Sequence, residues 1–92
     1  QKYFLYPAYP NPFNPAVSIR YDLREEGPVR IIIHDLAGRV VRTLLNKRQN
    51  FGAYTVIWNA VDHHHGPIPG GVYLLSIEAG NFRKTQKIML LK

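Results

Sequence analysis

Four adjacent residues, Asp62, His63, His64 and His65, are the side chains of this sequence best suited to bind a metal ion. Imidazole and carboxylate groups are common ligands of transition metals. In an extended loop, however, neighbouring side chains point apart, and a functional site also needs rigid ligands that further hydrogen bonds hold in place. We therefore expect a solvated turn in which the three histidines bind metal adventitiously at most, and we expect no cofactor.

The sequence offers little for nucleophilic or acid–base catalysis. Ser18 and Ser76 are the only serines, and neither stands in the Gly-x-Ser-x-Gly turn that exposes a nucleophilic serine. Cysteine is absent, and the six carboxylates sit mostly in expected turns without an obvious pair. A chain of 92 residues can also build only one modest core, which leaves little material for the walls of a cleft. We interpret the domain itself as non-catalytic.

Positive charge is the main bias of the composition. The chain carries 12 Lys and Arg residues against six Asp and Glu residues, which gives a formal net charge of +6. The basic residues are dispersed along the chain, and no aromatic-basic signature of RNA binding is present, so we expect no nucleic-acid partner. Because no run of 18 or more apolar residues occurs, we expect no membrane-spanning segment either.

Alternation of apolar and polar residues predicts the elements that would position a site. Such runs cover residues 17–23, 29–34, 39–45 and 53–58, followed by a hairpin over 71–92 that turns at 79–81. Residues 46–52 and 59–70 are predicted to be loops because they are rich in polar residues, glycine or proline. Together with an N-terminal edge segment, the pattern predicts an all-β fold: a small antiparallel immunoglobulin-like β-sandwich of about seven strands, forming a single domain over residues 1–92. The start at Gln1 in place of Met suggests a piece of a longer protein.

The strand pattern also predicts which side chains face the core. One face of each strand is apolar, and the residues expected to be buried are Val17, Ile19, Tyr21, Leu23, Val29, Ile31, Ile33, Tyr54, Val56, Trp58, Tyr73, Leu75, Ile77, Phe82, Ile88 and Leu90. The single tryptophan, Trp58, is expected to be the central block of this core.

Residues 1–16 combine proline with large aromatic side chains. Proline removes backbone donors and excludes a helix or a central strand, so this N-terminal segment should be an ordered loop or edge segment packed on the sandwich. A linker to an upstream domain is the alternative, although linkers favour Gly, Ser and Thr. Tyr3, Tyr6 and Tyr9 could also stack on a sugar, as in a carbohydrate-binding module, but packing of their rings on the protein is the favoured interpretation.

Short motifs follow one another along nearly the whole chain. The first part contains Tyr9-Pro10-Asn11-Pro12-Phe13-Asn14-Pro15, Ile19-x-Tyr21-x-Leu23 and Ile33-His34-Asp35-Leu36-Ala37-Gly38-Arg39-Val40-Val41. The later part contains Gly52-x-Tyr54-x-Val56-x-Trp58, Asp62-x-x-x-Gly66, Gly71-Val72-Tyr73 and Lys87-Ile88-Met89-Leu90-Leu91-Lys92. In this order they resemble the C-terminal sorting domain, type A, of the type IX (Por) secretion system. The immunoglobulin-like domain of flagellar hook-capping proteins is similar in the middle and later motifs.

The resemblance implies an address and no enzymatic activity. An upstream cargo would pass through the periplasm, and an outer-membrane translocon would recognise the folded domain. A sortase-like peptidase would then remove the domain, leaving the cargo extracellular or on the cell surface. By position, the resemblance implies recognition through Pro10, Asn11, Pro12, Phe13, Gly71, Val72, Tyr73, Lys87 and Lys92. We expect the last strand to offer a free edge for β-augmentation, whereas Gly71 and Tyr73 are expected to act through conformation and packing.

Two other functions remain open from the sequence. One is a carbohydrate-binding β-sandwich module, and the other is a structural immunoglobulin-like module appended to an enzyme or a hook scaffold. The chain also departs from the sorting-domain pattern: His34 stands where Tyr is usual, Arg24 where Pro is common and Gly70 where Ser is frequent. In addition, three histidines, at positions 63–65, fill one loop. None of these departures falls in the closing segment.

Overall fold

The computed structural model describes residues 3–92, which form seven β-strands and no helix. The strands are β1 (Tyr3–Leu5), β2 (Val17–Leu23), β3 (Gly27–His34), β4 (Val40–Gln49), β5 (Gly52–Trp58), β6 (Gly71–Ala79) and β7 (Phe82–Leu90). Gln1 and Lys2, the first residues of the expected N-terminal segment, lie outside the described residues.

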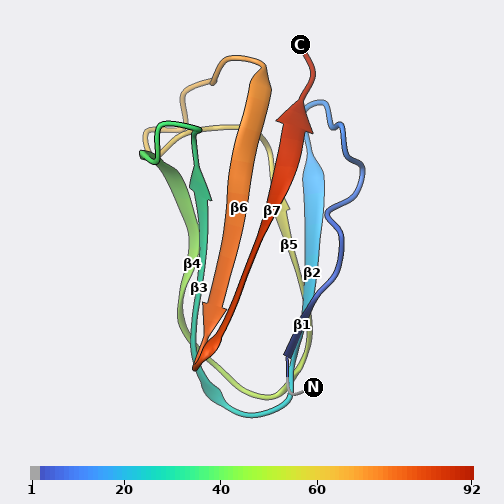
Figure 1. Ribbon diagram of the computed structural model, residues 1–92, viewed down its shortest axis with the longest axis vertical. Helices are drawn as coiled ribbons and strands as arrows, with labels where there is room; N and C mark the ends of the chain where they lie inside the picture. Colours follow the sequence, from blue (N-terminus) through green and yellow to red (C-terminus); the bar gives the residue numbers. More distant parts are fainter. Residues whose placement is uncertain (1–2) are drawn as a thin grey trace.

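The strands form two antiparallel sheets that pack face to face. One sheet has three strands in the order β1-β2-β5, and the other has four in the order β4-β3-β6-β7. Figure 1 shows β6 and β7 in front of β2 and β5, and it places β1 and the C-terminus at opposite ends of the long axis. The expected all-β sandwich of about seven strands is therefore confirmed.

Alternation along the strands builds most of the core as expected, but Tyr54, Val56 and Phe82, which were expected to be buried, are half-buried and pack against its edge. In β2 the side chains of Val17, Ile19, Tyr21 and Leu23 are at most 3% exposed, while Arg20 between them is exposed. The core lies between the sheets, and its buried members are Leu5, Ala8, Phe13, Val17, Ile19, Tyr21, Leu23, Val29, Ile31, Ile33, Trp58, Ala60, Ile68, Tyr73, Leu75, Ile77, Ala79, Ile88 and Leu90. Each large aliphatic or aromatic member stabilises the fold by about 1.5–3 kcal/mol through removal of its apolar surface from water.

Two turns follow from local chemistry that the sequence predicts. Asp35 caps the β3–β4 turn, because its Oδ1 accepts hydrogen bonds from the backbone N–H groups of Ala37 (3.0 Å) and Arg39 (2.9 Å). These bonds lower the pKa of the Asp35 carboxyl, and the bond from Arg39 has the largest effect. The β6–β7 hairpin turns at Gly80, whose φ of 60° lies in the left-handed region that glycine tolerates best.

The expected loop over residues 46–52 is wrong for its first half. β4 continues to Gln49, and its residues Asn46–Gln49 pair with Gly27–Arg30 of β3. The polar residues are tolerated in a strand because β4 lies at the edge of its sheet, where side chains and one row of backbone groups meet water. Arg48 also donates two hydrogen bonds, at 2.8 and 2.7 Å, to Glu26, which directly precedes β3.

Candidate functional site

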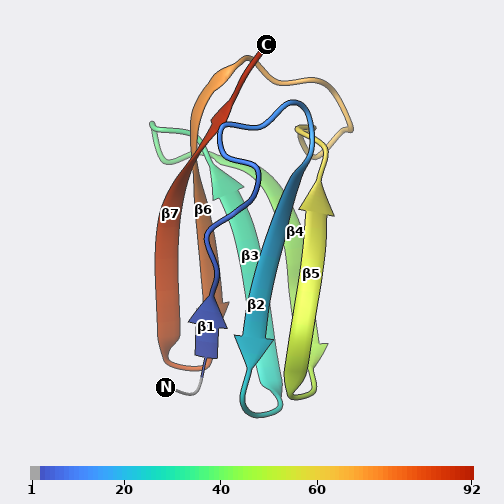
Figure 2. The ribbon, with the colours of Figure 1, turned by 90° about the vertical axis from the view of Figure 1, so that its right-hand side faces the viewer.

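The N-terminal segment crosses from one sheet to the other and runs along the edge of β7. Its start pairs with β2, where the backbones of Tyr9 and Ser18 exchange hydrogen bonds of 3.1 and 2.8 Å. Its end reaches the last strand, because Phe13 N donates to Met89 O at 2.8 Å and Leu91 N donates to Phe13 O at 2.9 Å. Figure 2 shows this path from β1 to the C-terminal end of β7. The segment is thus part of the fold, as expected.

Asn11 extends this contact through its side chain. Its Nδ2 donates to Lys87 O at 3.0 Å, and its Oδ1 accepts from Met89 N at 2.9 Å. The side-chain amide thus takes the place of a peptide group in a neighbouring strand. Asn11 and Phe13 together satisfy the outward backbone groups of β7 from the Lys87 carbonyl to the Leu91 amide.

Phe13 and Tyr73 anchor the same region in the core. Phe13 is 1% exposed and Tyr73 is 6% exposed, and their rings lie 5.8 and 6.1 Å from the Trp58 ring. The Tyr73 hydroxyl donates to Pro69 O at 2.6 Å, and burial raises the pKa of this hydroxyl. The Trp58 indole N–H donates to Val61 O at 2.9 Å. Phe13 and Tyr73 were expected at the recognition site, and both pack against Trp58 in the core.

Gly71 and Val72 bring the start of β6 to the same place. Gly71 has a φ of 144°, which favours glycine, and it marks the turn of the chain from the 59–70 loop into β6. In the hairpin register Gly71 lies opposite Leu90 and Val72 lies opposite Met89. The Gly-Val-Tyr motif thus pairs with the C-terminal end of β7, at the opposite end of the hairpin from Gly80.

A shallow hollow marks the meeting point of these elements. Its volume is about 270 Å³, and it is lined by Asn11, Pro12, Val72, Lys87, Ile88 and Met89. Four of these six residues were expected from the sequence, and they come from three separate motifs. Pro10 is exposed beside Asn11 in the chain. Lys92 does not line the hollow; it lies against Gly70, where an added Cβ would be 3.3 Å from the Lys92 Cβ.

Of the other two lining residues, Ile88 was expected in the core, and Met89 had no expected role. It is 41% exposed on the outer face of β7, directly opposite Val72. Counting outward from the two-residue turn at Gly80 and Asn81 would have paired these two positions, so the hairpin register carried the missing signal. The contact of Asn11 with Met89 had no such signal.

Comparison with known proteins identifies the class of this domain. The model of the family described as the secretion system C-terminal sorting domain matches residues 7–91. The chain belongs to this family. It is a type IX C-terminal sorting domain, whose role is that of a secretion-sorting signal directing export to the cell surface or the extracellular space. The family is not itself catalytic.

Two solved structures share the fold of the sorting domain. The structure titled as dimeric latent PorU from Porphyromonas gingivalis has a TM-score of 0.71 and 16% sequence identity, covering 97% of this chain and 9% of that one. PorZ of the same organism, described as an essential bacterial surface component of the type-IX secretion system, has a TM-score of 0.62 and 23% identity, covering 96% and 11%. The chain thus spans about a tenth of the length of these relatives. Comparison with curated proteins gave no match.

The histidine loop of the sorting domain is organised by Asp62. Its Oδ1 accepts hydrogen bonds of 2.9 Å from the backbone N–H groups of Gly66 and His64, and these bonds lower the pKa of the carboxyl. The rings of His63 and His64 lie 6.4 Å apart at a steep angle, and His65 has a φ of 62°. Within residues 3–92 no three metal-ligating side chains gather at one point. The Asp62 carboxylate therefore organises a turn, and a turn was expected for this loop.

The N-terminal tyrosines divide into packed and exposed rings. The Tyr3 ring lies 5.6 Å from that of Phe82, and the Tyr6 ring lies 4.7 Å from that of Phe4, so packing is confirmed for both. Packing is wrong for Tyr9, which is 77% exposed. Because Tyr9 sits in a bridge to β2, its side chain points opposite to that of buried Ala8.

The edge of the last strand differs from the sequence expectation. We expected a free edge for β-augmentation, but Asn11 and Phe13 already occupy it from the Lys87 carbonyl to Leu91. At this end of β7, Asn11 and Phe13 cover the backbone edge. The outer face of the strand and the hollow beside Pro12 remain exposed. In residues 3–92 no helix is long and apolar enough to cross a membrane.

Proposed function

We propose that this sorting domain directs an upstream cargo across the outer membrane and that the hollow beside Pro12 is the surface read by the type IX translocon. The cargo reaches the periplasm by its own signal peptide before this step. A sortase-like peptidase then removes the domain, and the cargo is released or joined to the cell surface. Residues 1–92 are the sorting part of that longer protein.

Three motifs converge at one hollow, and this convergence is the main support for a recognition surface there. Asn11, Val72 and Lys87 come from distant parts of the sequence, yet all three line the same 270 Å³ depression. A purely structural domain needs its motifs in the core, whereas this hollow is rimmed by exposed side chains. An exposed apolar patch with polar neighbours is typical of a protein contact surface.

The proposed roles of the motif residues follow from their exposure. Pro10, Asn11, Pro12 and Lys87 are exposed, and Val72 is half-buried, so these residues offer direct contacts. Lys92 adds a positive charge at the end of the chain. Phe13, Gly71 and Tyr73 act indirectly: two are buried against Trp58, and Gly71 sets the backbone direction of β6.

The sorting role is tested by export of a fluorescent passenger in a host that carries the type IX machinery. The passenger has a signal peptide for the inner membrane and is fused to residues 1–92. We expect it on the cell surface or in the medium, whereas the same passenger without residues 1–92 stays in the periplasm.

Removing the last strand is a poor control, because Ile88 and Leu90 are core residues and the domain would unfold. The matched control is therefore the passenger alone, together with protease resistance of the fused domain as proof of folding. Retention of a folded fusion in the periplasm would contradict the proposed role.

A further inference from the structure

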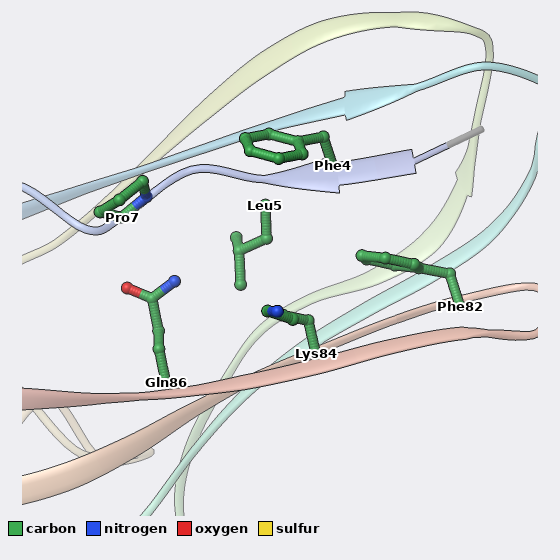
Figure 3. Close-up of a pocket in the computed structure, with 6 residues that line it drawn as sticks. All are labelled: Phe4, Leu5, Pro7, Phe82, Lys84 and Gln86. Atoms are coloured by element: carbon green, nitrogen blue, oxygen red, sulfur yellow. The ribbon is translucent and has the colours of Figure 1, made fainter. Parts of the chain in front are cut away.

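A second depression lies on the flank of the sandwich, between β1 and β7. Its volume is about 360 Å³, and it is lined by Phe4, Leu5, Pro7, Phe82, Lys84 and Gln86. Figure 3 shows Leu5 pointing from β1 toward β7, and Phe82, Lys84 and Gln86 pointing from β7 toward β1. We call this depression the flank groove. It shares no lining residue with the hollow beside Pro12.

The flank groove exists because two edge strands of unequal length face each other without pairing. β1 has three residues and β7 has nine, and they belong to different sheets. Contacts hold the two sides in place at both ends. At one end the ring of Tyr3 lies 5.6 Å from that of Phe82. At the other end the Gln86 amide accepts from Ala8 N at 2.8 Å and donates to Tyr6 O at 3.2 Å.

The strand edge beside the groove presents backbone groups for another strand. Lys87 O and Met89 N point away from β6, because both bond to Asn11. Backbone direction alternates along a strand, so the N–H and C=O groups of Arg83 and Thr85 point to the same side. The backbone hydrogen bonds of the N-terminal segment to this edge are those of Phe13 with Met89 and Leu91, further along the strand. Phe13, which pairs with the strand further along, shows that this edge of β7 accepts an added chain.

Charge specifies which kind of strand fits the groove. Lys84 is exposed, points into the groove, and has no carboxylate partner among residues 3–92. A lysine on an edge strand opposes pairing with neutral or basic strands and favours a strand with an acidic side chain opposite. An antiparallel second copy of β7 centred on Lys84 would place Lys84 opposite Lys84, so self-pairing in that register is disfavoured.

We propose that the flank groove binds an extended acidic segment of a partner protein, added to β7 as a strand beside Arg83 and Thr85. In this arrangement a carboxylate of the segment faces Lys84. The apolar residues two positions before and after it share its face and cover Phe4, Leu5 and Phe82, since side chains on one face of a strand recur every second residue. This binding goes beyond the sorting role, and its test does not depend on whether the domain is exported.

The test is a titration of isotope-labelled protein with a peptide, followed by NMR. The probe is acetyl-Thr-Val-Thr-Asp-Thr-Val-Thr-amide, which places two valines and the aspartate on one face. The comparison peptide has lysine in place of the aspartate. We expect saturable shifts of the backbone N–H signals of Arg83 and Thr85 with the acidic peptide, and much weaker ones with the basic peptide. Lys84→Glu should weaken binding of the acidic peptide about fivefold and reverse the preference between the peptides.

Matched variants separate the groove from general charge effects. Lys47→Glu makes the same charge change on β4, the other edge of the sheet, and should leave the affinity unchanged. Thr85→Pro removes an outward N–H that β6 does not use, so it should keep the fold and lose binding. Equal binding of both peptides, shifts confined to β4, or unchanged binding in Thr85→Pro would overturn the proposal. Concentration-dependent shifts at Arg83 without peptide would assign the edge to a second copy and overturn it as well.

Discussion

Replacing Asn11 by alanine should loosen the N-terminal segment from the last strand. The change removes two hydrogen bonds, to Lys87 O and from Met89 N. Each such bond contributes about 0.5–1.5 kcal/mol net, and water can reach the freed groups because this contact is exposed, so we expect a total loss of about 1–2 kcal/mol. For a domain of this size that loss lowers Tm by roughly 5–15 °C.

Two measurements follow the effect of Asn11→Ala. Urea unfolding monitored by Trp58 fluorescence gives the change in the free energy of unfolding, and amide hydrogen exchange gives the local protection of the Met89 N–H. The control is Asn14→Ala, an exposed asparagine of the same loop, which should change the free energy of unfolding by no more than about 0.5 kcal/mol. Equal midpoints for the two variants, or unchanged protection of Met89, would refute the role given to the Asn11 amide.

Three further predictions concern the core, the hairpin and the histidine loop. Phe13→Ala should lower the free energy of unfolding by about 3–5 kcal/mol in urea titrations, whereas Phe51→Ala, at an exposed site, should change it by about 0.5 kcal/mol or less; similar losses would place Phe13 outside the core. Gly80→Ala forces alanine into a φ of 60° and should cost about 1–2 kcal/mol, against a smaller loss for Gly27→Ala; the same Tm for both would contradict the turn geometry. The backbone N–H of Gly66 lowers the pKa of Asp62, so the stability that this carboxylate contributes is present above the ordinary pKa of 3.8 and is lost as the pH falls below it. The difference in urea midpoint between the native protein and Asp62→Ala should therefore shrink on acidification, and a constant difference would contradict this role.

Local patterns predicted most of the fold because alternation and turn chemistry act over short distances. The buried face of β2, the capping of the β3–β4 turn by Asp35, and the hairpin at Gly80 all depend on neighbours within a few residues. Trp58 was expected at the centre of the core from its size and its place on the apolar face of its strand, and Phe13 and Tyr73 do pack against it. The motif positions were predicted through the family resemblance.

Contacts between distant parts of the chain could not be predicted in the same way. The hydrogen bonds of Asn11 join residues 76 and 78 positions apart, and no local pattern marks them. For that reason the edge of β7 was expected to be free where it is covered. The polar end of β4 and the exposed ring of Tyr9 were missed for a related reason. In both cases pairing with a neighbouring strand, and not the residue type, decided the outcome.

A pair of charge reversals in the exported passenger shows whether the hollow beside Pro12 is the surface read during sorting. Lys87→Glu changes the rim of the hollow, and Lys47→Glu makes the same change on β4; both side chains are exposed, so both variants should fold. The measurement is the fraction of passenger that reaches the surface or the medium. We predict that Lys87→Glu lowers this fraction and traps folded passenger in the periplasm, while Lys47→Glu exports as the native domain does. Equal export of the two variants would show that the hollow is not the surface read during sorting.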